Sequence, residues 1–155
     1  MEHTYLYLEG IWGVKGHYYD EDNFPVPVNG RSEIHHRDGL WINESFMRVS
    51  GNEQEEVRNA YEIVPFASDF TVWNSVDRTM GRLIGKYMVV DDTIISTFLS
   101  EDGEFSGFEC MIKKSDTRYL VRGFIFAGKR KLSSWVLELN SYKLIRGNPG
   151  LSLIQ

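Results

Sequence analysis

The stretch Arg82–Asn140 decides the fold: RLIGKYMVV, DD, TIISTFLS, EDGE, FSGFECMIK, KSDT, RYLVRGFIF, AGK and RKLSSWVLELN, in chain order. Runs rich in β-branched and aromatic residues alternate here with short segments rich in Asp, Gly, Ser and Lys. Such runs, bounded by turn residues, predict strands. Parallel strands need long crossovers, so connections this short predict an antiparallel meander.

The same pattern continues toward the N-terminus. It predicts further strands at Gly10–Tyr19, Val26–His36, Leu40–Val49, Val57–Val64 and Phe70–Val76, with a further candidate pairing at Tyr142–Ile145. The only helical signal is a short turn near Glu53–Glu56. A meander of about ten strands must hide its two edges, and closing into a barrel does so. We therefore predict an all-β fold, a single antiparallel up-and-down β-barrel of about 8–10 strands that fills residues 1–155 as one domain.

Composition excludes several classes of protein. A net charge of −5 and a pI near 5.4 argue against a general nucleic-acid binder. No apolar run approaches the ~18 residues of a membrane span, and the start MEHTYLYLEG does not resemble a signal peptide. The single cysteine, Cys110, excludes an internal disulfide and a cysteine-based zinc site within one chain. We expect a cytoplasmic protein that binds neither nucleic acid nor membrane.

Alternation along the strands assigns an inner and an outer face. The predicted inner residues are Trp12, Val14, Gly16, Tyr18, Val28, Gly30, Ser32, Ile34, Leu83, Gly85, Tyr87, Val89, Phe108, Cys110, Ile112, Trp135, Leu137 and Leu139. Glu109 and Lys113 then point outward. Leu40–Val49 and Thr93–Ser100 carry apolar residues on both faces and are not oriented. Glycines within strands either relieve crowding where a barrel bends, which we favour, or leave interior volume for a ligand.

Gly10-Ile11-Trp12, at the head of the first long strand, resembles the G-x-W signature of calycins, the superfamily of lipocalins, avidins and fatty-acid-binding proteins. The order of segments, with PVNGRSEIHHRDGLW across strands two and three, also looks like bacterial lipocalin-like proteins. This resemblance implies a barrel whose floor is closed by Trp12. Two departures matter. Asp20–Pro25 is too short for the two-helix lid of fatty-acid-binding proteins. Nitrobindin-like barrels bind haem through a histidine late in the chain, and this sequence has no histidine after His36.

Arg122 is the most informative candidate for a binding site. Leu120 and Phe124 share its face of the strand. A guanidinium in such a row is either buried and paired or in contact with an anion, unless Val121 and Ile125 face inward and Arg122 is solvated. We take the inward orientation as the hypothesis, with Arg122 meeting an acidic group of a ligand.

Other polar side chains are candidates for the same space. His36 shares parity with inner residues of its strand and could face the cavity mouth, as a hydrogen-bonding group or a base. Asparagine amides and tyrosine hydroxyls on inner faces would bind a ligand, or would satisfy one another or bound water. The full set of candidate ligand-binding residues is Arg122, His36, Tyr18, Asn74, Asn59, Tyr61, Tyr87 and Phe124.

We expect no metal and no cofactor. His35 and His36 are adjacent, so they face opposite sides of a strand, and a site with His17 would need a carboxylate such as Glu33 or Asp38. The sequence holds no G-x-S-x-G, P-loop, dinucleotide fingerprint or H-E-x-x-H.

Three functions remain open, because fold alone does not choose between them. The favoured one is binding of a small, largely apolar or amphipathic molecule, which can carry an acidic group, inside the barrel. The second is a metal-independent isomerase, cyclase, lyase or decarboxylase whose acid/base pair is His36 or Tyr18 with Arg122. The third is an interaction module, a homodimer formed through exposed aromatic patches.

Overall fold

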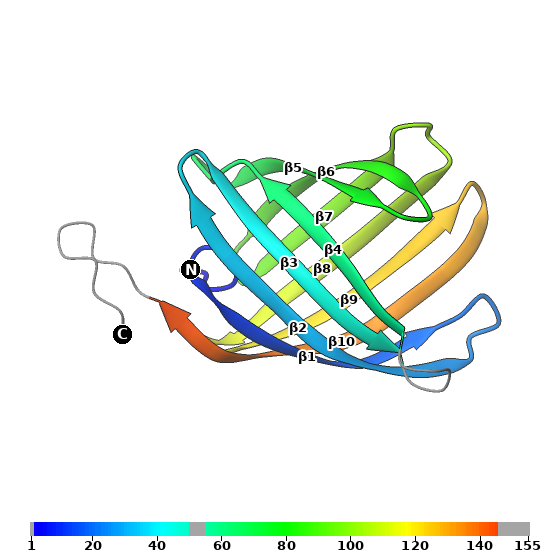
Figure 1. Cartoon of the computed structure of the whole chain (residues 1–155), viewed down its shortest axis with the longest axis horizontal. Coiled ribbons are helices and arrows are strands. Elements are labelled where there is room, and N and C mark those ends of the chain that lie inside the picture. Colours follow the sequence, from blue (N-terminus) through cyan, green and yellow to red (C-terminus); the bar gives the residue numbers. More distant parts are fainter. Residues whose placement is uncertain (1, 50–54, 146–155) are drawn as a thin grey trace.

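A computed structural model describes residues 2–49 and 55–145 of the chain. Its strands are β1 (Glu9–Tyr19), β2 (Pro25–Arg37), β3 (Leu40–Val49), β4 (Glu55–Ile63), β5 (Phe70–Asp77), β6 (Gly81–Val90), β7 (Thr93–Ser100), β8 (Phe105–Ser115), β9 (Arg118–Ala127) and β10 (Arg130–Ile145). Each strand pairs with its neighbours in the chain, and β10 pairs antiparallel with β1 to close the barrel (Figure 1). The predicted all-β, up-and-down barrel is confirmed.

Most of the predicted strand boundaries lie within two residues of the observed ones. Glu55 and Glu56 begin β4, so they are extended rather than part of a turn, and residues 53–54 of the predicted turn lie outside the described residues. The candidate pairing at Tyr142–Ile145 is confirmed, because β10 continues to Ile145, which lies opposite Glu9 of β1.

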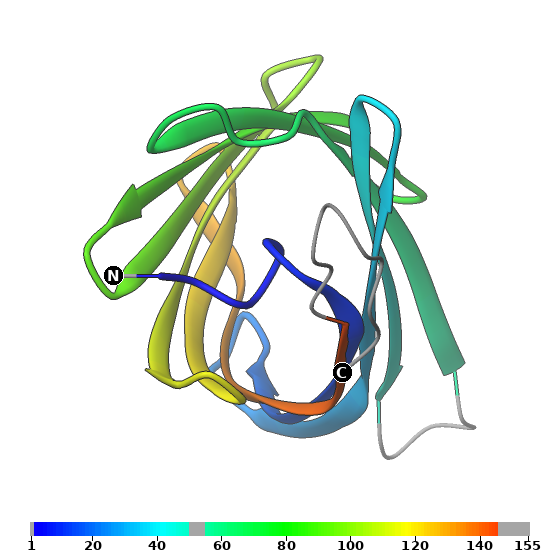
Figure 2. The same cartoon turned by 90° about the vertical axis from the view of Figure 1, so that its left-hand side faces the viewer.

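The segment before β1 closes one end of the barrel, which the sequence did not predict (Figure 2). The imidazole Nε2 of His3 donates to the main-chain oxygen of Asp91 at 2.8 Å, and the Tyr119 hydroxyl donates to Nδ1 at 2.7 Å. Thr4 Oγ1 donates to the main-chain oxygen of Asp116 at 2.7 Å. Burial lowers the pKa of His3, which favours the neutral ring that these two bonds require. The N-terminal segment is thereby tied to the turns that follow β6 and β8.

Trp12 lies at this closed end, as the resemblance to calycins implied. Its side chain is fully buried. The rings of Tyr5 and Tyr119 meet it edge-on, at centroid distances of 5.3 and 5.6 Å. Its Nε1 is buried and has no hydrogen-bond partner among the described residues. These aromatic rings fill the end of the barrel, so the interior space lies toward the opposite end.

Among the described strands, β4 and β5 share the shortest pairing. β4 and β5 pair only through Tyr61–Ile63 and Trp73–Ser75, whereas the other neighbouring strands pair over most of their length. The part of β4 before Tyr61 has no ladder partner on the β5 side within the described chain. In Figure 1, β4 diverges from β5 and β6 on the side away from the N-terminus. The backbone hydrogen-bond ladder is therefore interrupted between these strands at the end of the barrel opposite the N-terminal segment.

Candidate functional site

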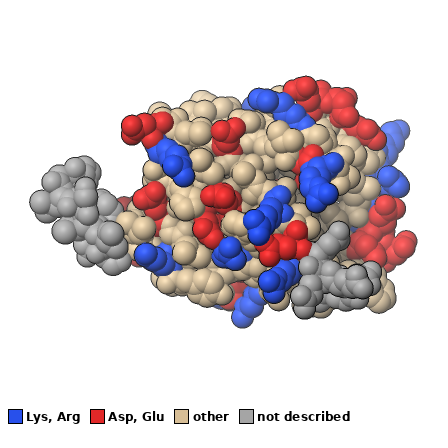
Figure 3. All heavy atoms as spheres, in the orientation of Figure 1, with Lys and Arg blue, Asp and Glu red and all other residues tan. Residues whose placement is uncertain are grey.

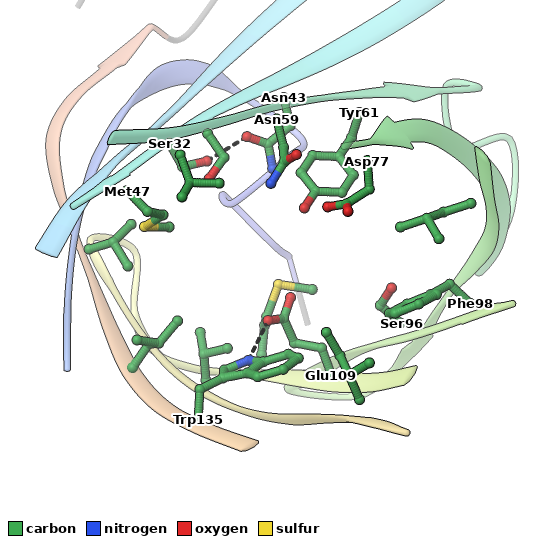
Figure 4. Close-up of a pocket in the computed structure, with 18 of the residues that line it drawn as sticks. Ser32, Asn43, Met47, Asn59, Tyr61, Asp77, Ser96, Phe98, Glu109 and Trp135 are labelled. Atoms are coloured by element: carbon green, nitrogen blue, oxygen red, sulfur yellow. Dashed lines mark hydrogen bonds between the residues drawn. The ribbon is translucent and has the colours of Figure 1, made fainter. Parts of the chain in front are cut away.

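The barrel encloses a cavity of about 360 Å³. All ten strands contribute side chains to it, and Tyr5 and Met80 complete the lining. Figure 4 draws 18 of these residues and labels ten, with Glu109 and Trp135 on the wall opposite Asn59 and Tyr61. A space of this size, lined mainly by apolar and aromatic groups with a few polar ones, is typical of small-molecule sites.

Three aromatic rings lie against the wall and so keep the interior open. Trp73 lies opposite Gly85 in the β5–β6 pair, and Trp135 lies opposite Gly123 in the β10–β9 pair. A Cβ atom on Gly85 would lie 2.0 Å from the Trp73 ring, and one on Gly123 would lie 2.4 Å from the Trp135 ring. The third ring, Phe98, covers Gly107 in the same way. These glycines therefore make room for aromatic rings of the neighbouring strand.

The two tryptophans use the same arrangement with different acceptors. Trp73 Nε1 reaches across β6 and donates to Ser96 Oγ of β7 at 3.2 Å. Trp135 Nε1 reaches across β9 and donates to Glu109 Oε2 of β8 at 2.7 Å. The second arrangement places a carboxyl group in the wall of the cavity, aimed inward (Figure 4).

Burial dominates the electrostatics of Glu109. Loss of hydration raises the pKa of Glu109 to about 7, and the hydrogen bond from Trp135 opposes that rise. The side chain is partly buried and lines the cavity. None of the described residues that line the cavity is Lys, Arg or His, so no positive charge offsets the carboxylate. Near neutral pH this carboxyl group is poised between its acid and its anion.

Tyrosine hydroxyls supply neutral polar groups to the same space. Burial raises the pKa of Tyr18 to about 12 and raises the pKa of Tyr61 and of Tyr87 well above the usual range. These groups are therefore protonated in neutral solution and can donate hydrogen bonds. Within the described chain, none of the three hydroxyls has a protein hydrogen-bond partner, and all three residues line the cavity.

A polar cluster forms the inner end of the cavity. Ser32 Oγ donates to Asn43 Oδ1 at 2.7 Å, and Asn43 Nδ2 donates to the Tyr5 hydroxyl at 3.1 Å. The Tyr5 hydroxyl and Ser32 Oγ lie 3.0 Å apart and complete the triangle. Because these groups form hydrogen bonds with one another, they stabilise the closed end of the barrel. The polar groups that have no protein partner in the described chain lie on the walls of the cavity.

Four of the predicted ligand-binding residues line the cavity: Tyr18, Asn59, Tyr61 and Tyr87. The orientation inferred for their strands is the observed one. Contact of these side chains with a ligand stays a prediction.

The predicted orientation of Arg122 and Phe124 is wrong by one residue. Arg122 is exposed, and its Nη1 donates to the main-chain oxygen of Val121 at 2.8 Å. Phe124 is 41% exposed and stacks on Phe108, with centroids 5.5 Å apart. Val121 and Ile125 face inward. The outer face of β8 and β9 carries aromatic residues. Because these residues are apolar, the sequence pattern of this outer face is that of a face packed in the core.

Asn74 and His36 also lie outside the cavity lining. Asn74 is on the outer face of β5, between the exposed Val72 and Val76. His36 has the predicted parity, but its end of the barrel is the one that the N-terminal segment closes. Its Nε2 donates to the main-chain oxygen of Leu6 at 2.8 Å, and its ring stacks on Trp41 at 4.2 Å. His36 therefore anchors the closed end and does not face a mouth.

Glu109 is the residue that sequence reasoning missed. The prediction placed Phe108, Cys110 and Ile112 inside, whereas the structure places Gly107, Glu109 and Met111 on the inner face. Apolar residues dominate the outer face of β8, so hydrophobic parity selects the wrong side. One signal was available: Gly107 shares parity with Glu109, and glycines occupy inner positions on β1, β2 and β6 as well.

Two further observations concern metals and membranes. In residues 2–49 and 55–145, no group of three or more His, Cys, Asp or Glu side chains could hold a metal ion. No helix in that part of the chain is long and apolar enough to cross a membrane.

Comparison with solved structures shows a likeness in fold to a chain of known structure. The S-type phycobiliprotein lyase CPES from Guillardia theta superposes with a TM-score of 0.68 over 87% of this chain and 88% of its own, at 11% sequence identity. An AttH structure from Nitrosomonas europaea covers 87% of this chain and 51% of its own, at 9% identity and a TM-score of 0.31, too low to support an argument. No family model and no curated protein sequence matches. The chain is a closed antiparallel barrel of ten strands, with a fold similar to that of the lyase.

Proposed function

We propose that the protein binds a small, largely apolar molecule inside the barrel. The cavity of about 360 Å³ is the observation that carries this proposal. Burial of apolar ligand surface contributes roughly 25 cal/mol per Å², which makes the aromatic and aliphatic walls the main source of affinity. The free hydroxyls of Tyr18, Tyr61 and Tyr87 then orient the ligand by hydrogen bonds.

The outer surface favours a small-molecule partner over nucleic acid. Acidic and basic side chains are interspersed on the face shown in Figure 3, whereas a nucleic-acid binder presents a continuous basic patch. The lone Cys110 supports a reducing compartment, so we propose a cytoplasmic location.

A matched pair of variants on β9 tests the proposal. Val121 lines the cavity, and its neighbour Leu120 lies on the other face of the strand. Native mass spectrometry of protein purified from its own host should show a bound small molecule. Val121→Trp fills the cavity and should abolish that adduct, whereas Leu120→Trp should retain it. Circular dichroism checks that both variants fold. An adduct that survives in folded Val121→Trp, or no binding of any apolar compound to the wild type, contradicts the proposal.

A second candidate is a lyase reaction in the same cavity. The likeness to a phycobiliprotein lyase over most of both chains favours it, although at 11% identity that likeness concerns the fold alone. Incubation of the protein with an apo-phycobiliprotein and its chromophore tests this function. A chromophore adduct that forms faster than in the absence of the protein supports it, and an unchanged rate argues for binding alone.

A further inference from the structure

Glu109 presents an oxygen to the cavity that lacks a protein partner. Oε2 accepts the indole N–H of Trp135 at 2.7 Å, and Oε1 accepts no hydrogen bond from any described residue. Removing a carboxylate from water is costly unless it is paired, and no basic side chain of the described chain lines the cavity. The second oxygen is therefore available to a molecule inside the barrel.

Packing does not explain why a carboxyl group stands at this position. On the other side of the barrel, Trp73 lies over Gly85 and donates its N–H to Ser96 Oγ at 3.2 Å. A neutral hydroxyl is thus a sufficient acceptor for an indole in the same arrangement. At Glu109 the chain carries an ionisable group in place of the hydroxyl, and that group has one hydrogen-bonding oxygen more than the indole needs.

We propose that Glu109 makes the cavity selective for ligands that carry a nitrogen hydrogen-bond donor, preferably a cationic one, on a largely apolar body. This inference rests on the proposed function, because it names the ligand class of the same cavity. An ammonium or other N–H group on Oε1 supplies the missing partner in a charge-assisted hydrogen bond. A ligand carboxylate would instead face Glu109 and Asp77 with no cation nearby, which disfavours it.

Glu109 is the residue that we expect to control how binding of a cationic ligand depends on pH. The titratable side chains that face it across the cavity are Tyr5, Tyr18, Tyr61, Tyr87 and Asp77. The four tyrosines have a raised pKa and are neutral in physiological solution. Asp77 is engaged in its own turn, where Oδ1 accepts from the amides of Thr79 and Met80 at 2.8 and 2.9 Å. A cationic ligand should therefore bind more tightly as Glu109 ionises.

Three naphthalene compounds that differ only in their polar group test the inference. Naphthylmethylamine is cationic, naphthylmethanol is neutral and naphthoate is anionic. Isothermal titration calorimetry measures each dissociation constant at about pH 5.5 and about pH 8, on either side of the pKa of Glu109 near 7. The variants are Glu109→Gln, which keeps an acceptor for Trp135, and Glu109→Ser, which copies the Trp73–Ser96 arrangement. Glu138→Gln, on the outer face of β10, is the control.

We expect the wild type to bind the amine at least ~10-fold more tightly than naphthoate at the higher pH, as a charge-assisted hydrogen bond predicts. That preference should shrink at the lower pH, disappear in both Glu109 variants and persist in Glu138→Gln. Binding of naphthylmethanol should change less than about threefold in any variant. If naphthylmethanol binds but the amine has no preference, or keeps it in both Glu109 variants, the assignment of Glu109 is overturned and the proposed function stands. If none of the three compounds binds, the assignment of Glu109 is overturned, whereas the proposed function fails only if the wild type also carries no bound molecule in its native mass spectrum.

Discussion

Replacing Glu109 by Gln should change how the stability of the barrel depends on pH. In the folded protein the pKa of Glu109 is about 7, raised from an ordinary value of 4.5 by burial. Between these two pH values the folded state keeps a proton that the unfolded chain has released. The free energy of unfolding must therefore fall as pH rises through this window, and it must level off above about pH 7.

The size of this effect follows from the shift in pKa. A difference of about 2.5 units, at 1.36 kcal/mol per unit, corresponds to about 3 kcal/mol lost from the wild type by pH 8. Gln has the same shape and no proton to lose, so Glu109→Gln should gain about 3 kcal/mol relative to the wild type between about pH 4.5 and pH 8. Urea denaturation followed by tryptophan fluorescence measures both proteins at each pH. Taking the difference between them removes the contribution of all other titrating groups.

The control for this experiment is Glu138→Gln. Glu138 accepts a hydrogen bond from Arg118 Nε at 2.8 Å on the outer surface, and that contact lowers its pKa. The difference between this variant and the wild type should therefore have the opposite sign, with stability lost from the variant above the window in which Glu138 titrates. Parallel pH profiles for the wild type and Glu109→Gln would refute the reasoning, because they would mean that Glu109 is hydrated or paired with a cation.

Three further outcomes follow from the packing. Trp12→Ala should lower the free energy of unfolding by about 3–5 kcal/mol in urea, since it empties the closed end of the barrel, and a loss under roughly 1 kcal/mol would contradict that role. Gly85→Ala should displace the Trp73 ring, so we expect a lower melting temperature and altered near-ultraviolet circular dichroism; an unchanged spectrum would be evidence against the packing of Trp73 on Gly85. Arg122→Leu should change stability by less than about 0.5 kcal/mol and leave naphthylmethanol affinity unchanged by calorimetry, because Arg122 is exposed outside the barrel; weaker binding would restore the inward orientation.

The strands were predictable because both of their signals are local. Residues such as Asp91-Asp92 and Glu101–Glu104 interrupt the β-forming runs, and turns this short permit only antiparallel neighbours. Faces were predictable wherever the outer face is polar, as in β1, where Lys15 and His17 point outward between inner apolar residues. The prediction of a closed barrel of about 8–10 strands rested on the strand pattern together with the need to hide the edges of a long meander.

The candidate site was only partly predictable, because its decisive residues break the rule that apolar side chains face inward. Phe108 and Phe124 stack on the outside of β8 and β9, and Glu109, the residue after Phe108, lies on the inner face. The position of His36 depended on the N-terminal segment, whose contact with Tyr119 joins residues 116 positions apart. No local pattern encodes a contact of that kind.

The pairing of β1 with β10 has a consequence for synthesis on the ribosome. β1 is translated early, but one of its edges stays unpaired until β10 has left the exit tunnel. The N-terminal segment cannot form its contact with Tyr119 before β9 has been synthesised, because Tyr119 lies on that strand. Until then the nascent chain is an open sheet whose free edges can pair with other chains. The barrel therefore closes only after β10 has been synthesised. The yield of native protein should depend on how quickly β10 is translated and on chaperones that cover the unpaired edge of β1.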